Sequence, residues 1–570
     1  MDYLEKLTLK NLLTKSVDLY GDRPALCFVD GAETTYKFLG EQVQEISDFL
    51  HNQGIGAGDR VAILSENQPN WGAAYFAIAA IGAVVVPILP DFHSNEVHHI
   101  LRHSAAKALF VSTRLYEKVE DGDFYDEVKT VILIDDFSLV PPEIPRDRLK
   151  ELIKKGSIEF EKLKEIARRL TGKAQGNPRE NDTAVIIYTS GTTGRSKGVM
   201  LSHKNIVFDA IAGLKIQDIT PKDRLISILP LSHSYEGTLG FVMPIMRGAT
   251  IYYLRKPPTA RVLLPAMQKV KPTMVLTVPL IIEKIYRTKI LPKFQQNALL
   301  RGLYKIPLIR KRLNRAAGKK LMESFGGNLS FFGIGGALLA PDVERFLREA
   351  KFPYAIGYGL TETAPMIAGS SPENTRYRST GPPLSDIEMK IDKPDPKSGE
   401  GEIFVRGANV MQGYYNDPES TAEVLTEDGW FRTGDLGMLD KDNYLFIKGR
   451  LKNMILGPSG ENIYPEEIEA KINECAHVVE SLVFQQDAKL VARVHLDYES
   501  LDKLFKDQNL TESQIHKRVM ELLEGIRKGV NALVSSFSRI NRMIEQLEPF
   551  EKTPTKKIKR YLYSADVHDV

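Results

Sequence analysis

Short apolar runs alternate with amphipathic, helix-like stretches along most of the chain. The runs are four to six residues long, are rich in Val, Ile and Ala, and have the composition of buried strands. Strands that alternate with helices predict an α/β architecture with largely parallel sheets, whose ligands bind beyond the carboxyl ends of the strands. The predicted strands cover residues 61–64, 83–88, 108–112, 130–134 and 184–188.

The longest uncharged stretch runs from Trp71 to Pro90, and its twenty residues match the length needed to span a bilayer. Ala and Gly dominate its first half, whereas the β-branched run 84–86 and two prolines follow. This change of composition predicts a buried helix that leads into a buried strand, rather than a membrane-spanning helix.

The character of the chain changes near residues 449–452. Upstream of this point, residues 392–400 are rich in proline and charge and predict a turn into a β-rich unit, whereas the elements beyond it are shorter and more charged. We therefore expect an N-terminal domain of residues 1–448 and a C-terminal domain of residues 453–570. In the C-terminal domain, residues 531–560 are expected to form a helix followed by a basic loop.

Length and composition narrow the class of protein. The 570 residues predict roughly three to four compact units, and 43% hydrophobic and 26% charged residues are typical of globular chains. The formal net charge of +3 gives no reason to expect a nucleic-acid partner. Cys27 and Cys475 are the only cysteines and residues 1–13 contain no secretory signal, so we expect a cytoplasmic protein.

A loop rich in glycine and hydroxyl residues follows the predicted strand 184–188. Residues 189–198 read TSGTTGRSKG, and their backbone amides, Arg195 and Lys197 are suited to cradle a phosphate. The spacing is not that of a Walker A loop, and a solvated Ser/Gly loop is the alternative. The segment GRSKG also matches the G-x-S-x-G pattern of esterases. Because the predicted strand ends well before Ser196, a serine hydrolase is only a minor alternative.

Two further short segments offer groups that suit a nucleotide. Gly333 to Ala337 (GIGGA) would allow the close approach of a flat ligand, although a tight turn is the alternative. Tyr358 to Thr363 (YGLTET) combine an aromatic ring that can stack on a base with Glu362, a hard oxygen ligand suited to Mg²⁺. By itself this second segment is also compatible with an ordinary turn.

Eight motifs follow one another along the chain. They are YTSGTTGRSKGVMLSH (188–203), LPLSHSYEG (229–237), GIGGA (333–337), YGLTET (358–363), GEIFVRGANVMQGYYN (401–416), WFRTGDLG (430–437), GRLKN (449–453) and KTPTKKIKR (552–560). In this order and spacing they resemble the motifs of adenylate-forming enzymes, the superfamily of acyl-CoA synthetases, luciferases and peptide-synthetase adenylation domains, over nearly the full length of the chain. LPLSHSYEG followed by VPLIIEKIY (278–286) is most similar to long-chain fatty acyl-CoA synthetases.

The resemblance implies both an architecture and an ATP site. The architecture is a large N-terminal domain of two α/β subdomains and a small β-rich subdomain, with a small mobile α+β C-terminal domain after a hinge at 449–452. In the ATP site, Thr193 and Glu362 would bind Mg²⁺, the backbone of 335–337 would help to enclose the adenine, and Asp435 would accept hydrogen bonds from both ribose hydroxyls. The implied ATP-binding residues are Thr189, Ser190, Gly191, Thr192, Thr193, Gly194, Lys197, Gly335, Gly336, Ala337, Tyr358, Gly359, Thr361, Asp435, Arg450 and Lys452.

The resemblance also implies residues for the acyl group and for CoA. His233 corresponds to a position near the acyl carboxylate, and Gly460 lies in the loop that enters the pantetheine tunnel. Lys452 matches the hinge residue between the domains. Glu362, His233 and Lys557 are the implied catalytic residues.

The terminal motif and two other positions depart from the family pattern. That pattern is Pro-Lys-Thr-x-Ser/Thr-Gly-Lys-Ile-x-Arg, and here Glu551 replaces the proline and Lys556 the glycine, while the remaining matches select Lys557. The Lys557 ammonium would stabilise charge that develops as the carboxylate attacks the α-phosphorus. Ser196 stands where proline is usual, and Ile356 where a polar residue often precedes Gly-Tyr-Gly.

The sequence is thus interpreted as an AMP-forming long-chain fatty acid:CoA ligase that uses ATP, Mg²⁺ and CoA. The alternatives are transfer to an acyl carrier protein, or a catalytically impaired acyl or nucleotide binder marked by the substitutions at Ser196, Ile356 and Lys556. From Lys284 to Lys320 there are twelve basic residues and no acidic one. This segment is either a solvated face or a peripheral contact with the anionic inner face of a membrane.

Overall fold

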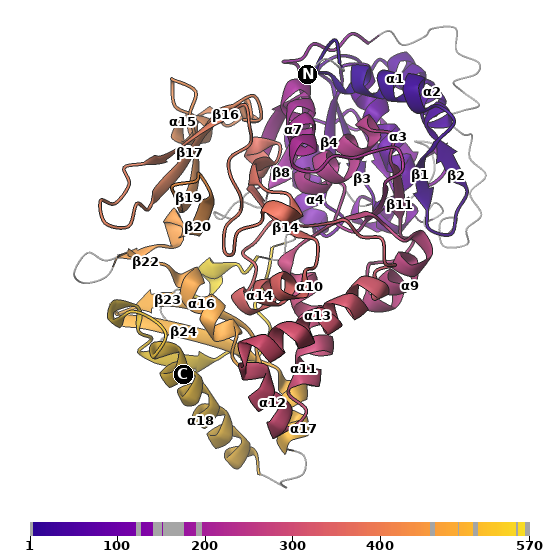
Figure 1. Cartoon of the computed structure of the whole chain (residues 1–570). Helices are drawn as coiled ribbons and strands as arrows, with labels where there is room; N and C mark the ends of the chain where they lie inside the picture. Colours follow the sequence, from indigo (N-terminus) through magenta and orange to yellow (C-terminus); the bar gives the residue numbers. More distant parts are fainter. Residues whose placement is uncertain are drawn as a thin grey trace.

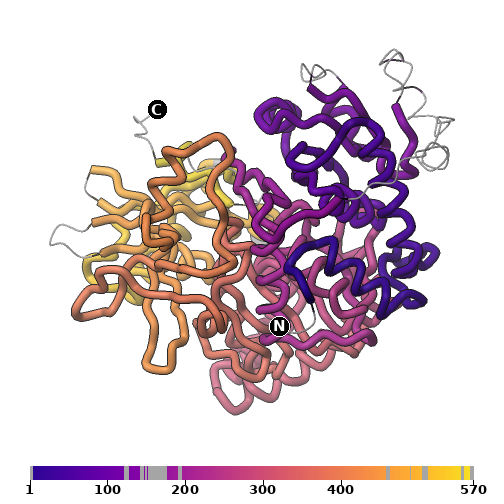
Figure 2. The backbone as a smooth tube through the Cα atoms, turned by 90° about the horizontal axis from the view of Figure 1, so that it is seen from above, coloured from indigo at the N-terminus to yellow at the C-terminus, as the bar shows by residue number. Residues whose placement is uncertain are grey.

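Two large sheets, a small antiparallel sheet and a C-terminal part make up the molecule (Figure 1). Seen from above, the orange and yellow part of the chain lies beside the indigo and magenta part (Figure 2). The predicted α/β fold class is confirmed, since both large sheets are mainly parallel. The structure, a computed structural model, describes residues 4–120, 127–140, 147, 151, 176–189, 196–456, 462–487, 489–505, 511–553 and 557–564.

The first large sheet contains all five strands predicted from the apolar runs. At its centre β3 (Arg60–Leu64) pairs in parallel with β4 (Val84–Ile88) and with β5 (Ala108–Val111). Beyond them, β8 (Thr183–Thr189) joins β4 and β6 (Thr130–Leu133) joins β5, again in parallel. The edges are antiparallel: β7 (Ser138–Leu139) on one side, β9 (Lys197–Ser202) and β18 (Gly413–Tyr414) on the other.

The uncharged stretch from Trp71 to Pro90 forms a buried helix and a buried strand, as predicted. Helix α3 (Pro69–Ala80) has a fully buried Trp71 stacked on Tyr75, and β4 follows it into the centre of the sheet. Within the described residues, no helix is both long and apolar enough to cross a membrane.

The second large sheet lies against the same core and has the strand order β15-β14-β13-β12-β10-β11-β1-β2. All neighbouring strands in it are parallel, except for the pairs at its two ends. Its strands are β1 (Pro24–Phe28), β2 (Glu33–Thr35), β10 (Arg224–Ser227), β11 (Thr250–Tyr253), β12 (Met274–Thr277), β13 (Phe331–Ile334), β14 (Tyr354–Gly359) and β15 (Met366–Gly369).

Helices cover both sheets, and the first three pack on one another at the indigo side of Figure 1. One segment between α7 and α8 is a π-helix, η2 (Tyr235–Val242), which follows the LPLSH motif. The helices of the N-terminal part are α1 (Leu9–Tyr20), α2 (Tyr36–Asn52), α3, α4 (Ser94–Ser104), α7 (His203–Ile216), α8 (Met243–Met246), α9 (Ala260–Val270), α10 (Pro279–Ile285), α11 (Leu291–Phe294), α12 (Ala298–Lys305), α13 (Pro307–Ser324), α14 (Pro341–Ala350) and α15 (Pro418–Val424).

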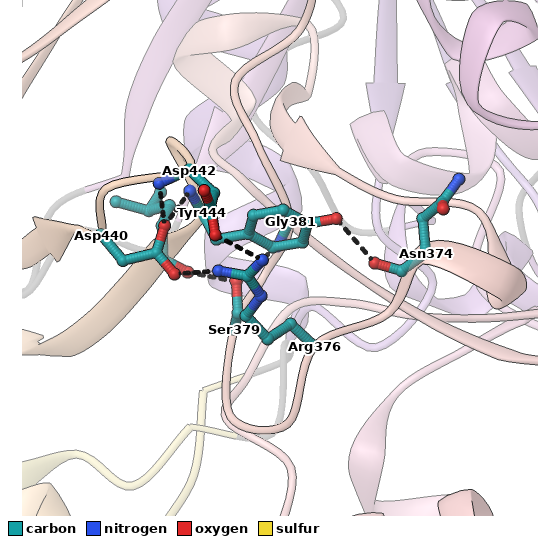
Figure 3. Close-up of polar contacts among 8 residues, drawn as sticks. Asn374, Arg376, Ser379, Gly381, Asp440, Asp442 and Tyr444 are labelled. Carbon is teal, nitrogen blue, oxygen red and sulfur yellow. Dashed lines mark hydrogen bonds and ion pairs between the residues drawn. The ribbon is translucent and has the colours of Figure 1, made fainter.

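A small antiparallel sheet follows, with the order β16 (Ile387–Asp392), β17 (Gly401–Gly407), β19 (Phe431–Leu439) and β20 (Leu445–Arg450). Its outer turn is clamped to the loop after β15, as Figure 3 shows. The Arg376 guanidinium pairs with Asp440 and with Asp442 (3.0 Å), and its carbon lies 3.9 Å from the centre of the Tyr444 ring. The Tyr444 hydroxyl donates to the Asn374 carbonyl (3.0 Å), which fixes the hairpin that carries Asp435.

The C-terminal part has its own hydrophobic core, formed by side chains between Ile463 and Met543. A mixed sheet of three strands lies against two helices. The elements are β21 (Ile455–Leu456), β22 (Asn462–Ile463), α16 (Pro465–Asn473), β23 (Val478–Gln486), β24 (Lys489–Leu496), α17 (Tyr498–Phe505), α18 (Glu512–Asn531) and β25 (Arg542–Glu545). The exact boundary at 449–452 remains a prediction.

The expectation for residues 531–560 is wrong. Helix α18 ends at Asn531, and β25 follows eleven residues later and pairs in parallel with β24. The Asn531 side chain accepts a hydrogen bond from the Ile540 amide (2.8 Å) and donates to its carbonyl (2.9 Å), which closes the turn between helix and strand. Strand β25 lies at the edge of its sheet and is held by its pairing with β24, so its four residues need not show the sequence pattern that predicts a strand.

Polar side chains connect the small sheet to the C-terminal part. The Tyr464 hydroxyl donates to Glu400 (2.8 Å), and Lys448 pairs with Glu400 (2.9 Å) and with Glu467 (3.8 Å). Tyr464 caps α16 and Glu467 lies in its first turn. These contacts therefore hold the start of α16 against the small sheet.

Candidate active site

A buried carboxylate, Asp435, is held between two sheets. It is only 5% exposed and lies opposite Arg450 in the β19–β20 pairing. One of its oxygens accepts a hydrogen bond from the Tyr358 hydroxyl (2.7 Å), and the other pairs with Arg450 Nε (2.8 Å). Burial raises the pKa of the Asp435 carboxyl, whereas Arg450, Tyr358 and Lys557 act in the opposite direction. The structure thus brings three predicted ATP-binding residues together.

Lys557 comes from the C-terminal part and lies near Arg450, Asp435 and Glu362; we call the place where these four side chains meet the cleft. The Lys557 backbone pairs with Thr553, because the Thr553 amide donates to the Lys557 carbonyl (2.8 Å), and a bridge between Lys552 and Ile558 closes the short hairpin. The side chain remains accessible to solvent, but protein surrounds the ammonium on most sides. This burial and the nearby Arg450 lower the pKa of Lys557, against the opposing effect of Asp435 and Glu362.

Glu362 lies in a single 3₁₀ turn, η4 (Thr361–Thr363), which begins two residues after the end of β14. One of its oxygens accepts a hydrogen bond from the Tyr414 hydroxyl (2.9 Å). The approach to this turn requires glycine at position 359, because a Cβ there would lie 1.8 Å from the Pro365 carbonyl oxygen. Thr361 faces Ser234 at 3.4 Å between their hydroxyl oxygens.

Tyr414 is a site residue that our reading of the sequence missed. Besides its bond to Glu362, its ring lies 4.9 Å from Lys197 Nζ, within the range of a cation–π contact. Tyr414 therefore connects the YGLTET turn to the strand that leaves the phosphate loop. The only signal for it was its place in the motif GEIFVRGANVMQGYYN, which contains two adjacent tyrosines.

The predicted phosphate loop lies between two paired strands. Thr189 ends β8 and is paired with Lys197, the first residue of β9. The predicted residues Ser190, Gly191, Thr192, Thr193 and Gly194 lie outside the described residues, as does Arg195. Ser196 comes directly before strand β9 and not at a strand-to-helix turn, so its setting differs from that of a nucleophilic esterase serine.

Gly335, Gly336 and Ala337 leave β13 beside the end of β14, which carries Tyr358. Gly336 has φ of +85°, a conformation that glycine adopts freely, and a Cβ on Gly335 would lie 3.2 Å from the Tyr235 ring. The exposed Gly336 and Ala337 are thus placed to border the cleft near Tyr358.

His233 lies between the cleft and the apolar interior. Burial, together with the charge of Lys557, lowers its pKa to about 4, so the imidazole is neutral at pH 7. Its Nδ1 accepts a hydrogen bond from the Tyr235 amide (3.3 Å). A neutral imidazole beside Lys557 suits a position that contacts a carboxylate without adding a second cation.

An apolar cavity lies behind the GIGGA segment, between α7, η2 and the second sheet. Its volume is about 40 Å³, so the surrounding apolar side chains nearly fill it. Ile356 lines this cavity and is 8% exposed, which explains why an apolar residue stands where a polar one is usual. Other lining residues include Tyr235, Leu239, Met243, Leu276 and Gly333.

Besides the phosphate loop, two predicted residues are not placed in the cluster. Lys452 lies in the 3₁₀ turn η6 (Leu451–Asn453), where its side chain is exposed and makes no ion pair with any residue that the structure describes. Gly460 lies outside the described residues. The predicted roles of both in hinge motion and CoA binding therefore remain predictions.

Comparison with known proteins identifies the class that this fold and site define. The family model described as "AMP-binding enzyme" matches residues 13–415, and the chain belongs to this family. It is 30% identical to the long-chain-fatty-acid–CoA ligase FadD15 of Mycobacterium bovis over 93% of this chain and 91% of that protein. It is 28% identical to fatty acyl-CoA synthetase A of Dictyostelium discoideum over 93% of this chain and 85% of that protein.

The fold also matches a solved structure. O-succinylbenzoate coenzyme A synthetase from Bacillus subtilis, in complex with ATP and magnesium ion, superposes with a TM-score of 0.71 at 22% identity. The match covers 97% of this chain and 98% of that one. At this level of identity the match establishes the fold of the whole chain, including its C-terminal part.

Proposed function

We propose that the protein is an ATP-dependent fatty acid:CoA ligase that forms an acyl-AMP intermediate. The observation that carries the proposal is the convergence of Lys557, Glu362, Asp435 and Arg450 on one cleft, although they come from distant parts of the chain. Membership of the AMP-binding enzyme family and the names of its fatty-acid ligase relatives support the same reaction.

The ATP site is assigned to the walls of this cleft. Asp435 would receive the ribose hydroxyls, since each of its oxygens has one hydrogen-bond partner and retains a second lone pair. Tyr358, Gly336 and Ala337 would border the adenine, and Thr189 and Lys197 would flank the phosphates.

The residues present fit a magnesium ion. Tyr414 holds one oxygen of Glu362, and the structure describes no partner for the other. One carboxylate combined with substrate phosphates is a usual environment for Mg²⁺ in proteins. Glu362 and Thr193 would hold the ion, which would neutralise phosphate charge.

The first half-reaction joins the fatty carboxylate to the α-phosphorus. A carboxylate oxygen forms the new P–O bond, while the bond from the α-phosphorus to the bridging oxygen breaks and pyrophosphate leaves with that oxygen. Lys557 stabilises the negative charge that grows on the α-phosphate oxygens in this step. His233 orients the carboxylate from the acyl side, and the chain would extend toward the apolar cavity behind the GIGGA segment, which would have to widen to hold it.

The second half-reaction transfers the acyl group to CoA. The thiol sulfur, after loss of its proton, attacks the acyl carbonyl carbon, and AMP leaves with its phosphate oxygen. Lys557 and the incoming thiol would compete for one cleft, so the C-terminal part would rotate about Lys452 and bring the Gly460 loop to the site. Such a rotation requires only a few residues that absorb the change in backbone angles.

The test is pyrophosphate release with fatty acids from short to very long, measured without acceptor, with CoA and with a holo acyl carrier protein. We expect release to require ATP and Mg²⁺, and thioester to form with CoA. Thioester with the carrier protein alone would identify an acyl-ACP synthetase. Absence of turnover with every acid, despite nucleotide binding, would instead identify an impaired binder.

A further inference from the structure

The basic segment from Lys284 to Lys320 folds into α10 to α13, on the side of the molecule opposite α1 and α2 in Figure 1. Two of its twelve basic residues are neutralised: Arg287 pairs with Asp342 (3.4 Å) and Arg310 with Glu349 (2.8 Å). The other ten are exposed and make no ion pair with the described residues. They are Lys284, Lys289, Lys293, Arg301, Lys305, Lys311, Arg312, Arg315, Lys319 and Lys320.

Large apolar side chains are exposed within the same segment. Leu299 is 72% exposed, Ile306 47% and Leu308 62%, and all three lie in α12 or at the corner where α12 meets α13. Exposed leucines are common singly, but three that share one short helix and its corner form a local apolar tip. We call these three residues and the ten unpaired cations the basic–apolar face.

Helix α12 is held in place from its other side. The Tyr304 ring stacks on Phe294 with 4.7 Å between the ring centres, and its hydroxyl donates to Asn314 (3.0 Å). The Asn297 side chain caps the first turn by accepting the Leu300 amide (2.8 Å). No residue of α12 is buried, so this helix uses its inner side for anchoring and presents the rest to solvent.

We propose that the basic–apolar face docks on an anionic lipid surface. An interfacial helix combines apolar side chains that enter the headgroup region with Lys and Arg that contact the lipid phosphates, and α12 with its corner has both. Nucleic acid would use the cations alone and would leave Leu299 and Leu308 in water. This inference does not depend on the proposed function, since the observations that carry it lie outside the cleft.

The experiment is vesicle co-sedimentation of the full chain at low and at physiological salt. Vesicles of phosphatidylcholine alone are compared with vesicles in which about a third of the lipid is phosphatidylglycerol. We expect binding only to the anionic vesicles, with weaker binding at higher salt because surface charge is screened. Binding that is independent of anionic lipid or of salt would overturn the proposal.

Two variants separate the contributions of charge and apolar surface. Arg301→Ala/Lys305→Ala/Arg312→Ala should lower the partition coefficient about 100-fold, at about fivefold per cation. Leu299→Ala/Leu308→Ala should lower it on the order of tenfold per leucine. All five side chains are exposed, and thermal unfolding curves that match the parent would exclude a folding defect.

A charge-matched control tests whether net charge alone explains binding. Lys37→Ala/Lys222→Ala/Lys256→Ala removes three exposed lysines elsewhere on the surface and should bind vesicles like the parent. Equal loss in the control and in the first variant would overturn the assignment of this face. Tight binding to a duplex DNA at physiological salt, with no binding to anionic vesicles, would identify a nucleic-acid surface and also overturn it.

Discussion

Replacing Lys557 with alanine should separate the two half-reactions. The substitution removes the Lys557 ammonium from the neighbourhood of Asp435 and Arg450, and it leaves Asp435, Arg450 and Tyr358 bonded to one another. Release of pyrophosphate should fall strongly. Conversion of supplied acyl-AMP and CoA into thioester should stay close to that of the parent, because Lys557 would be withdrawn from the site in that step.

The decrease in the adenylation rate expected for Lys557→Ala follows from the surroundings of the Lys557 ammonium. Two unit charges about 4 Å apart interact by about 4 kcal/mol at an effective dielectric constant of about 20. The accessible side chain and the nearby Arg450 reduce this benefit, so we expect about 3 to 4 kcal/mol in the transition state. That corresponds to a decrease of about 10² to 10³ in the adenylation rate, comparable to the loss of one oxyanion-hole donor.

Two neighbouring lysines serve as controls. Lys559 pairs with Glu551 (3.2 Å), so Lys559→Ala should adenylate like the parent. Lys556 lies outside the described residues. Lys556→Ala is expected to do the same, because the alignment of KTPTKKIKR assigns the catalytic role to Lys557. If Lys556→Ala loses adenylation and Lys557→Ala does not, the alignment of KTPTKKIKR is shifted by one residue. If both half-reactions fall equally in Lys557→Ala, the assigned role is refuted.

Three further predictions concern the hinge, the Glu362 wall and the acid stability of the fold. Lys452→Pro should slow thioester formation much more than adenylation in separate half-reaction assays, because proline fixes φ; equal losses would place Lys452 in ATP binding. Tyr414→Phe removes the 2.9 Å hydrogen bond to Glu362 but keeps the ring, so the adenylation rate should fall about tenfold and require a higher Mg²⁺ concentration. An unchanged dependence of the rate on Mg²⁺ concentration would contradict this. Burial lowers the pKa of His203 to about 4 in the folded state, so the unfolded chain binds more protons below pH 6.5 and stability should fall from there toward pH 4. The free energy of unfolding, measured in urea at several pH values, should fall by up to about 1.4 kcal/mol per pH unit, and by less in His203→Gln. An unchanged dependence on pH in the variant would mean that other groups cause the acid sensitivity.

The large sheets were predictable because their central strands are buried on both faces. Runs such as 61–64 and 184–188 are apolar throughout, and that pattern identifies a parallel strand without any knowledge of its neighbours. β25 was not predictable in this way, since its four residues, Arg542 to Glu545, owe their conformation to β24.

In the candidate site, too, some residues could be predicted from the sequence and others could not. Glu362, Asp435 and Lys557 stand in motifs whose chemistry suits a nucleotide, so the sequence indicated them. That Lys557 reaches the cleft depends on how the C-terminal part is oriented, which no local pattern encodes. Tyr414 was missed because a tyrosine in a strand is usually a core residue, and only the fold places its hydroxyl against Glu362.

The contacts among Glu400, Lys448, Tyr464 and Glu467 set how firmly the molecule holds the arrangement described here. Each is a polar contact near water, and partly exposed ion pairs contribute only about 0 to 1 kcal/mol apiece. Water can replace every one of these polar partners as the parts separate, whereas the Tyr464 ring, which is 8% exposed here, would gain contact with water. If the enzyme alternates between two orientations in each catalytic cycle, this junction lets thermal motion drive the exchange, and ionic strength becomes a means of shifting the balance between them.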